Sequence, residues 1–157
     1  MTEADRATAT LVQRTLEEHA YWVVCWFRWV DPAGWATYQP IIAHSMPGPV
    51  PSLLAYVARR GMLKQTWQQG VARHPPEEIF ARGVADIDAV LHVLGDKPFL
   101  LGDEPCSLDA IGYAFLVQCV QREWDNAFVQ HCRNSEALMA YLARMRARYW
   151  SDWSPAA

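Results

Sequence analysis

The stretch from Pro98 to Leu116, PFLLGDEPCSLDAIGYAFL, constrains the fold of this 157-residue chain more than any other. Its first half contains a glycine and two prolines and predicts a tight turn. Its second half opens a segment with no charged residue between Asp109 and Arg122. A helix that is apolar on almost every side is buried on almost every side. We therefore predict a buried central helix over residues 106–122.

The start of this helix is also specified by the sequence. Asp109 stands three residues after Cys106, at the third helical position. From there a carboxylate accepts a hydrogen bond from the backbone N–H of the cap residue, as in a capping box. We predict that Asp109→Ala costs about 1–2 kcal/mol of stability, through the lost cap and a lost buried polar contact.

The remaining periodic segments predict further helices and no strand. Apolar spacing indicates helices over residues 2–30, 52–69, 76–94 and 124–131, and a last one that begins at residue 135. Residues 31–51 hold five prolines and two glycines, which predicts an irregular connection. Because this segment also contains Trp35 and Tyr38, we expect an ordered flap folded over the bundle. Residues 1–157 thus predict a single all-α domain, a bundle of five or six helices around the 106–122 helix.

Composition excludes several classes of function. The net charge is −3 and the pI about 5.9, so no basic surface favours nucleic acid. No apolar run approaches the ~20 residues that span a bilayer, and the first residues lack a signal-peptide pattern. The four cysteines show neither metal nor disulfide spacing. We expect a cytoplasmic protein with no metal site and no membrane span.

The turn and helix (FLLGDEP, SLDA and GYAFL) resemble the C-terminal helical domain of glutathione transferases, most closely the metaxin and failed-axon-connections branch. EEHAYW, RRGMLKQ, RHPPEEI and LMAYLARMRARYW follow that branch in the same order, so the resemblance covers roughly positions 10–150. In this family an N-terminal thioredoxin-like domain binds glutathione. The resemblance implies that the chain lacks that domain, and with it any glutathione site or other cofactor. Met1 and the capping Thr2 favour an independent start.

The resemblance also implies a pocket for a hydrophobic co-substrate, lined by the first helix, the connection after it and the C-terminal end. The residues at the first two of these places are Tyr21, Trp22, Cys25, Trp26, Trp29, Trp35 and Tyr38. Trp150 and Trp153 stand at the third. Two interpretations of the aromatic stripe remain open. It either lines a pocket for a flat apolar ligand or forms core or subunit interface.

Few residues suggest catalysis. His44, in the proline-rich connection, is the best candidate for a general base, although no nucleophile or acid stands at a recognisable spacing. Cys25 is either a reactive thiol or a small buried residue. Arg28 and Glu18 form either a polar anchor beside the aromatics or two solvated charges.

These features predict a helical protein that binds a hydrophobic or aromatic small molecule in an aromatic-lined pocket. An enzymatic version would be transferase-like, or a lyase, isomerase or cyclase that works without glutathione on an apolar substrate. The alternatives are a protein–protein interaction module and the C-terminal piece of a longer transferase-like protein. A stripe left uncovered by a missing domain also predicts a homodimer, because monomers rarely expose large apolar patches.

Overall fold

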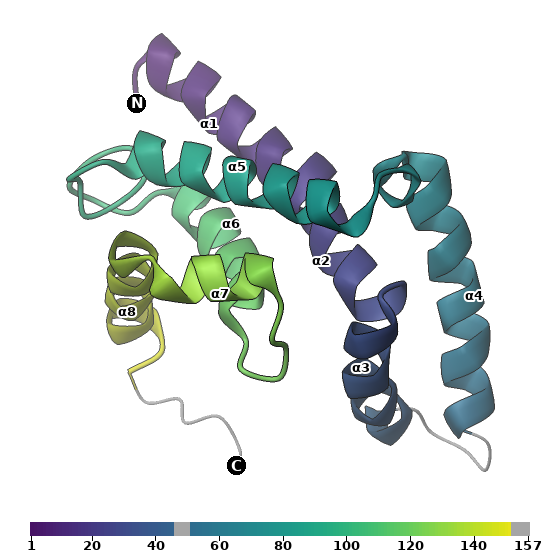
Figure 1. Ribbon diagram of the computed structural model, residues 1–157. Coiled ribbons are helices and arrows are strands. Elements are labelled where there is room, and N and C mark those ends of the chain that lie inside the picture. Colours follow the sequence, from purple (N-terminus) through teal and green to yellow (C-terminus); the bar gives the residue numbers. More distant parts are fainter. Residues whose placement is uncertain (46–50, 152–157) are drawn as a thin grey trace.

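The computed structural model describes residues 1–45 and 51–151, and within them it contains helices and no strand (Figure 1). The helices are α1 (Glu3–Thr15), α2 (Tyr21–Trp29), α3 (Pro32–Ser45), α4 (Pro51–Gln69), α5 (Pro76–Leu94), α6 (Ser107–Leu116), α7 (Ala127–Asn134) and α8 (Glu136–Tyr149). A π-helical turn joins α1 to α2, and short 3₁₀ turns follow α4 and α6. The predicted all-α class is confirmed, and α3 is a helix that the prediction did not include.

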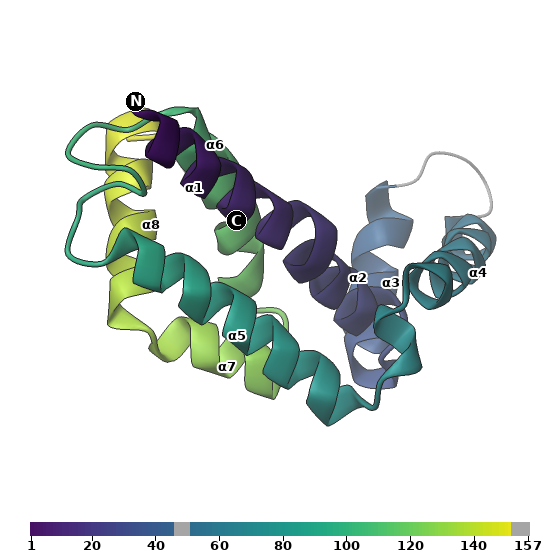
Figure 2. The ribbon, with the colours of Figure 1, turned by 90° about the horizontal axis from the view of Figure 1, so that it is seen from above.

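The helices form a body with an arm at one end. The rod of α1 and α2 lies beside α5, which contacts α7, while α6 contacts α8 (Figure 2). Phe27, Ile87, Leu116, Phe128 and Leu138, from five different helices, are fully buried in the resulting core. The arm consists of α3 and α4, which lie together at the end of the molecule away from α8 (Figures 1 and 2). None of the described helices combines the length and the apolar character that crossing a bilayer requires.

The predicted first helix, 2–30, is one rod with an irregularity in its middle. Thr2 caps it, since the Thr2 hydroxyl accepts a hydrogen bond from the Asp5 N–H (3.1 Å) and the Asp5 carboxylate accepts one from the Thr2 N–H (2.6 Å). At Leu16–Ala20 the helix widens into a π turn. A π turn inserts one residue into the helical repeat. The side chains of α2 are therefore rotated relative to a regular continuation of α1.

The turn before α6, residues 98–106, is called the hook below. Asp109 holds it as predicted, but the helix itself differs from the prediction. The Asp109 carboxylate accepts a hydrogen bond from the Cys106 N–H at 2.9 Å. The predicted 106–122 helix is divided, because α6 ends at Leu116 and a 3₁₀ turn, Val117–Val120, follows it. Burial is also one-sided, since Ala110 and Ala114 are exposed. Alanine is common on exposed helix faces because it is the best helix former, so an apolar sequence overstated the burial.

The prediction of an irregular connection over 31–51 is wrong for Pro32–Ser45, which forms α3. Pro32 occupies the first helical position, where its missing N–H has no cost. The Asp31 carboxylate accepts a hydrogen bond from the Gly34 N–H (2.8 Å) and caps the helix. Residues 46–50 of the predicted flap lie outside the described residues. Counting prolines misled the prediction because Pro32, like Pro51, starts a helix.

The helix α4 buries small residues and exposes large apolar ones. Ala55 and Thr66 are buried, whereas Val57 and Trp67 are 60% and 58% exposed. Arg59 donates hydrogen bonds to the carbonyls that end α2 and lies over the Trp35 ring at 4.7 Å. A cation at the C-terminal end of a helix is favourable. Arg59 therefore attaches the arm to the body through α2.

Candidate small-molecule site

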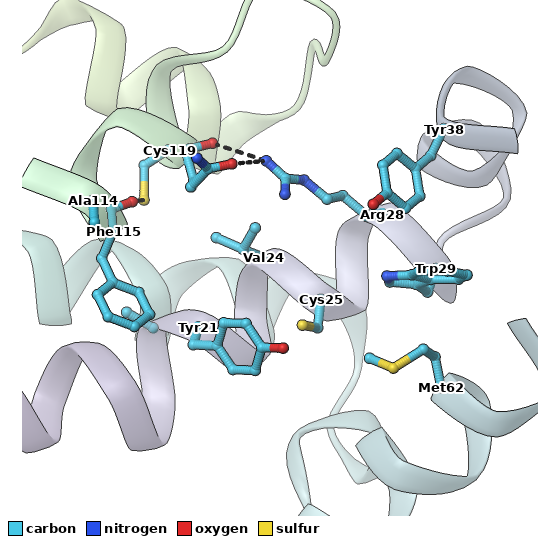
Figure 3. A pocket seen from close by; sticks show the side chains of 12 residues that line it. Tyr21, Val24, Cys25, Arg28, Trp29, Tyr38, Met62, Ala114, Phe115 and Cys119 are labelled. Atoms are coloured by element: carbon cyan, nitrogen blue, oxygen red, sulfur yellow. Dashed lines mark hydrogen bonds between the residues drawn. The ribbon is translucent and has the colours of Figure 1, made fainter. Parts of the chain in front are cut away.

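A cavity of about 380 Å³ lies where the arm meets the body, between α2, α3, α4, the end of α6 and the 3₁₀ turn after it (Figure 3). Its volume is in the range of small-molecule pockets, towards the small end. The lining residues are Ala20, Tyr21, Val24, Cys25, Arg28, Trp29, Tyr38, Met62, Ala114, Phe115, Gln118 and Cys119. The cavity is thus built mainly of aromatic, aliphatic and sulfur-containing side chains.

Four of the seven residues predicted from the sequence line this cavity, namely Tyr21, Cys25, Trp29 and Tyr38. The other three lie elsewhere, and each packs against a neighbouring ring. Trp26 is 6% exposed and its ring meets that of Phe80 on α5 edge to face. Trp22 packs against the body beside Tyr21, and Trp35 stacks on Trp29 at 5.7 Å. The stripe therefore serves both interpretations, since part of it is cavity lining and part of it is core.

The cavity has one charged lining residue, Arg28. Its Nη2 donates to the side-chain oxygens of Gln118 and Gln121, both at 2.9 Å. The guanidinium lies over the Trp124 ring at 4.7 Å, a cation–π contact. Burial lowers the pKa of Arg28 from its ordinary value. The ordinary pKa of arginine is so high that the side chain stays charged at neutral pH.

Comparison with known proteins identifies the family. Residues 83–145, which run from α5 through α8, match the model of the glutathione S-transferase C-terminal domain. This part of the chain is similar to the C-terminal domain of glutathione S-transferases. This confirms the family predicted from the turn and helix around Asp109.

Two relatives are similar to this chain over most of its length. An isoprene-epoxide–glutathione S-transferase of Rhodococcus sp. (strain AD45) is 38% identical over 150 residues, covering 91% of this chain and 61% of the relative. Failed axon connections of Drosophila melanogaster is 26% identical over 153 residues, covering 88% of this chain and 36% of the relative. The chain thus spans less than two thirds of either relative. No solved structure gives a significant match.

Tyr21 and Cys25, one helical turn apart on α2, give the domain's cavity two proton-bearing groups. A hydrogen bond with Cys25, followed by the charge of that group and burial, raises the pKa of Tyr21 to about 12. Burial raises the pKa of the Cys25 thiol. Both groups are therefore protonated at neutral pH. The cavity offers hydrogen-bond donors and no thiolate nucleophile on α2.

The histidines of the domain lie away from the cavity. His44, the predicted general base, is exposed near the end of α3 and is absent from the cavity lining. His19 pairs with Asp86 of α5, and His131 with Asp88 at 2.7 Å. Among the described residues no group of three or more histidine, cysteine or acidic side chains could hold a metal ion.

The sequence did not reveal the half of the lining that comes from other helices. Met62 of α4 and Phe115, Gln118 and Cys119 after the hook are distant from α2 in the chain, and no spacing rule connects them. Arg28 was considered with Glu18 as an anchor pair, but Glu18 instead pairs with Arg14 at 3.3 Å on the surface. The sequence feature that could have marked Arg28 as a lining residue is that it is a single cation among the apolar residues of this helix.

Proposed function

We propose that this domain binds a flat, apolar small molecule in the cavity between the arm and the body. The observation that carries the proposal is the lining, in which the rings of Tyr21, Trp29, Tyr38 and Phe115 surround about 380 Å³. Aromatic surface of this kind favours planar ligands. The Rhodococcus relative is named for isoprene epoxide, and an epoxide of isoprene is small and mostly apolar, which supports the same class of ligand here.

We also propose that these residues bind no glutathione, because the resemblance assigns the tripeptide to a thioredoxin-like domain outside the matched helices. The protonated Tyr21 and Cys25 support a proton-assisted step of the lyase or isomerase kind more than attack by a thiol. The four free cysteines support the expected cytoplasmic location, since reduced thiols are typical of that compartment.

Filling the cavity provides the test. Ala114 lines the cavity from α6 and is exposed, so a larger side chain can be placed there without disturbing the core. Ala114→Trp is expected to weaken binding of the neutral dye N-phenyl-1-naphthylamine at least tenfold, because the indole occupies the ligand's space. Fluorescence titration measures the affinity.

Ala110→Trp is the matched control, because Ala110 is exposed one turn earlier on α6 and lies outside this lining. It should bind the dye as the parent does. Reduced glutathione, added to the same titration, should not displace the dye. The absence of saturable dye binding by the parent would reject the proposed function, and equal binding by Ala114→Trp would move the site elsewhere.

A homodimer is the second proposal, and the outer face of α4 favours it. The apolar side chains of this face, which we call the arm face, are exposed by 39–60%. They are Leu53, Tyr56, Val57, Leu63 and Trp67. Association through this face by a two-fold axis would remove these apolar side chains from water. This is also the surface that an interaction module would use.

Trp67→Glu is expected to convert the dimer to a monomer, because it places a carboxylate within the arm face. Light scattering after gel filtration measures the mass. Gln65→Glu introduces the same charge two positions earlier, on the other side of the helix, and should remain dimeric. Because Arg60 and Lys64 are exposed within the face, added salt should strengthen the dimer by screening their repulsion. A parent protein that is monomeric at all salt concentrations would refute the proposal.

A further inference from the structure

We infer that the ligand of the cavity is an anion, a flat apolar body that carries a carboxylate, and that Arg28 binds the carboxylate. This inference rests on the proposed function and narrows it to one chemical class. It starts from the charge of the lining, where Arg28 is the one charged residue among the 12 that surround the cavity. A cavity with a cation and no anion has a net attraction for a negatively charged group.

Arg28 has no carboxylate partner among the described residues. The three hydrogen bonds it makes all use Nη2, and the acceptors are uncharged oxygens of Gln118 and Gln121. Its Nε is buried and makes no hydrogen bond to any described residue. Glu123 favours the charged form of Arg28 only weakly and does not line the cavity. The guanidinium is therefore held by neutral groups while its charge is left uncompensated.

A partly desolvated cation without an anionic partner destabilises the protein when no ligand is bound. Arginine side chains that leave water are normally paired, because desolvation of a charge is costly without a partner. The cost here is visible in the lowered pKa of Arg28, which burial causes. A bound carboxylate would compensate the charge, and Nη1 is the nitrogen left to bind it, because Nη2 donates to Gln118 and Gln121 and Nε is buried.

The surroundings of Arg28 give the anion a fixed position relative to the apolar body. Trp124 lies against the guanidinium at 4.7 Å and Tyr38 at 5.8 Å, which limits its rotation. In Figure 3 the guanidinium lies on one side of the cavity, and Tyr21 and Phe115 lie on the other. A carboxylate at Arg28 would therefore leave the body of the ligand among these rings.

The test compares two probes of nearly the same shape, 2-naphthoate and the uncharged 2-naphthamide, by isothermal titration calorimetry. The parent protein is expected to bind naphthoate at least tenfold more tightly than naphthamide. Arg28→Gln should reduce this preference below twofold, and Arg28→Lys, which keeps the charge but loses the planar fork, should give an intermediate value. Arg14→Gln removes a surface cation that pairs with Glu18 and should leave the preference unchanged.

The outcomes separate this inference from the proposed function. If N-phenyl-1-naphthylamine binds the parent but naphthoate binds no better than naphthamide, the cavity is a ligand site and the carboxylate inference is wrong. If none of the three compounds binds, the proposed function is wrong and the inference with it. The comparison in the parent protein needs no substitution, so it decides the matter even if Arg28→Gln does not fold.

Discussion

Asp109→Ala is expected to lower the free energy of unfolding by about 3–5 kcal/mol, which is more than the roughly 1–2 kcal/mol predicted from the sequence, because the structure shows additional hydrogen bonds to this carboxylate. Asp109 is fully buried, and its carboxylate accepts hydrogen bonds from the Cys106 thiol at 3.3 Å and from three further donors. They are the N–H of Cys106 at 2.9 Å, the N–H of Leu100 at 2.8 Å and the hydroxyl of Tyr141 at 3.2 Å. Alanine would leave all three buried or partly buried donors without this acceptor. Urea unfolding followed by circular dichroism measures the change.

Two further variants separate the contributions to this loss of stability. Tyr141→Phe removes the hydroxyl alone and should cost about 1 kcal/mol, the typical net contribution of one hydrogen bond. Asp103→Ala removes an exposed carboxylate from the same turn and should leave stability within about 0.5 kcal/mol of the parent. A cost of only 1–2 kcal/mol for Asp109→Ala would mean that its bonds to Leu100 and Tyr141 add nothing to the cap.

Gly34→Ala is expected to cost about 2–4 kcal/mol and to abolish binding of the neutral dye. A Cβ at residue 34 would lie 1.6 Å from the backbone oxygen of Phe27, so α3 would have to move away from α2. Backbone atoms of a helix cannot yield as the tip of a side chain can. Movement of α3 would separate Tyr38 from Trp29, two neighbouring rings of the cavity lining that are in edge-to-face contact.

Gly61→Ala is the matched control for this substitution. Residue 61 lies in the middle of α4, and a Cβ there would meet no atom within 4 Å. Alanine is a better helix former than glycine, so this variant should be more stable than the parent by about 0.5–1 kcal/mol. The same chemical change thus has opposite expected signs at the two sites. Equal unfolding midpoints and equal dye affinities for Gly34→Ala and the parent would show that α3 does not pack on α2 as described.

The features that the sequence predicted correctly depend on residues close together in the chain. The start of the first helix at Thr2, the start of α8 after Ser135 and the hook at Asp109 each follow from a cap and its partner three residues later. The family was recognisable from the same local motif. Predicted ends of helices were less accurate where the chain changes direction, as after Leu116.

The features that were missed depend on contacts between distant segments. Helix α3 is docked by Gly34, whose carbonyl accepts a hydrogen bond from the indole of Trp124, 90 residues later in the chain. The predicted 124–131 helix is found at Ala127–Asn134 instead, where the Asn126 side chain caps it by accepting a hydrogen bond from the Val129 N–H at 2.9 Å. The cavity likewise exists only once α2, α4 and the end of α6 are brought together. Periodicity shows that a face is apolar, but it does not show what the face meets.

The π turn at Leu16–Ala20 determines which side chains of α2 face the cavity. An α-helix turns by about 100° per residue, so one residue more or fewer in this turn would rotate everything after it by that angle relative to α1. Deleting one residue there would change the direction in which Tyr21, Cys25 and Arg28 point while leaving the amino acids themselves unchanged. In an alignment, a single-residue gap at this place would therefore mark a relative whose cavity has a different lining, even where the flanking sequences agree. Insertions and deletions in this turn offer evolution a way to change ligand preference without altering any residue of the site.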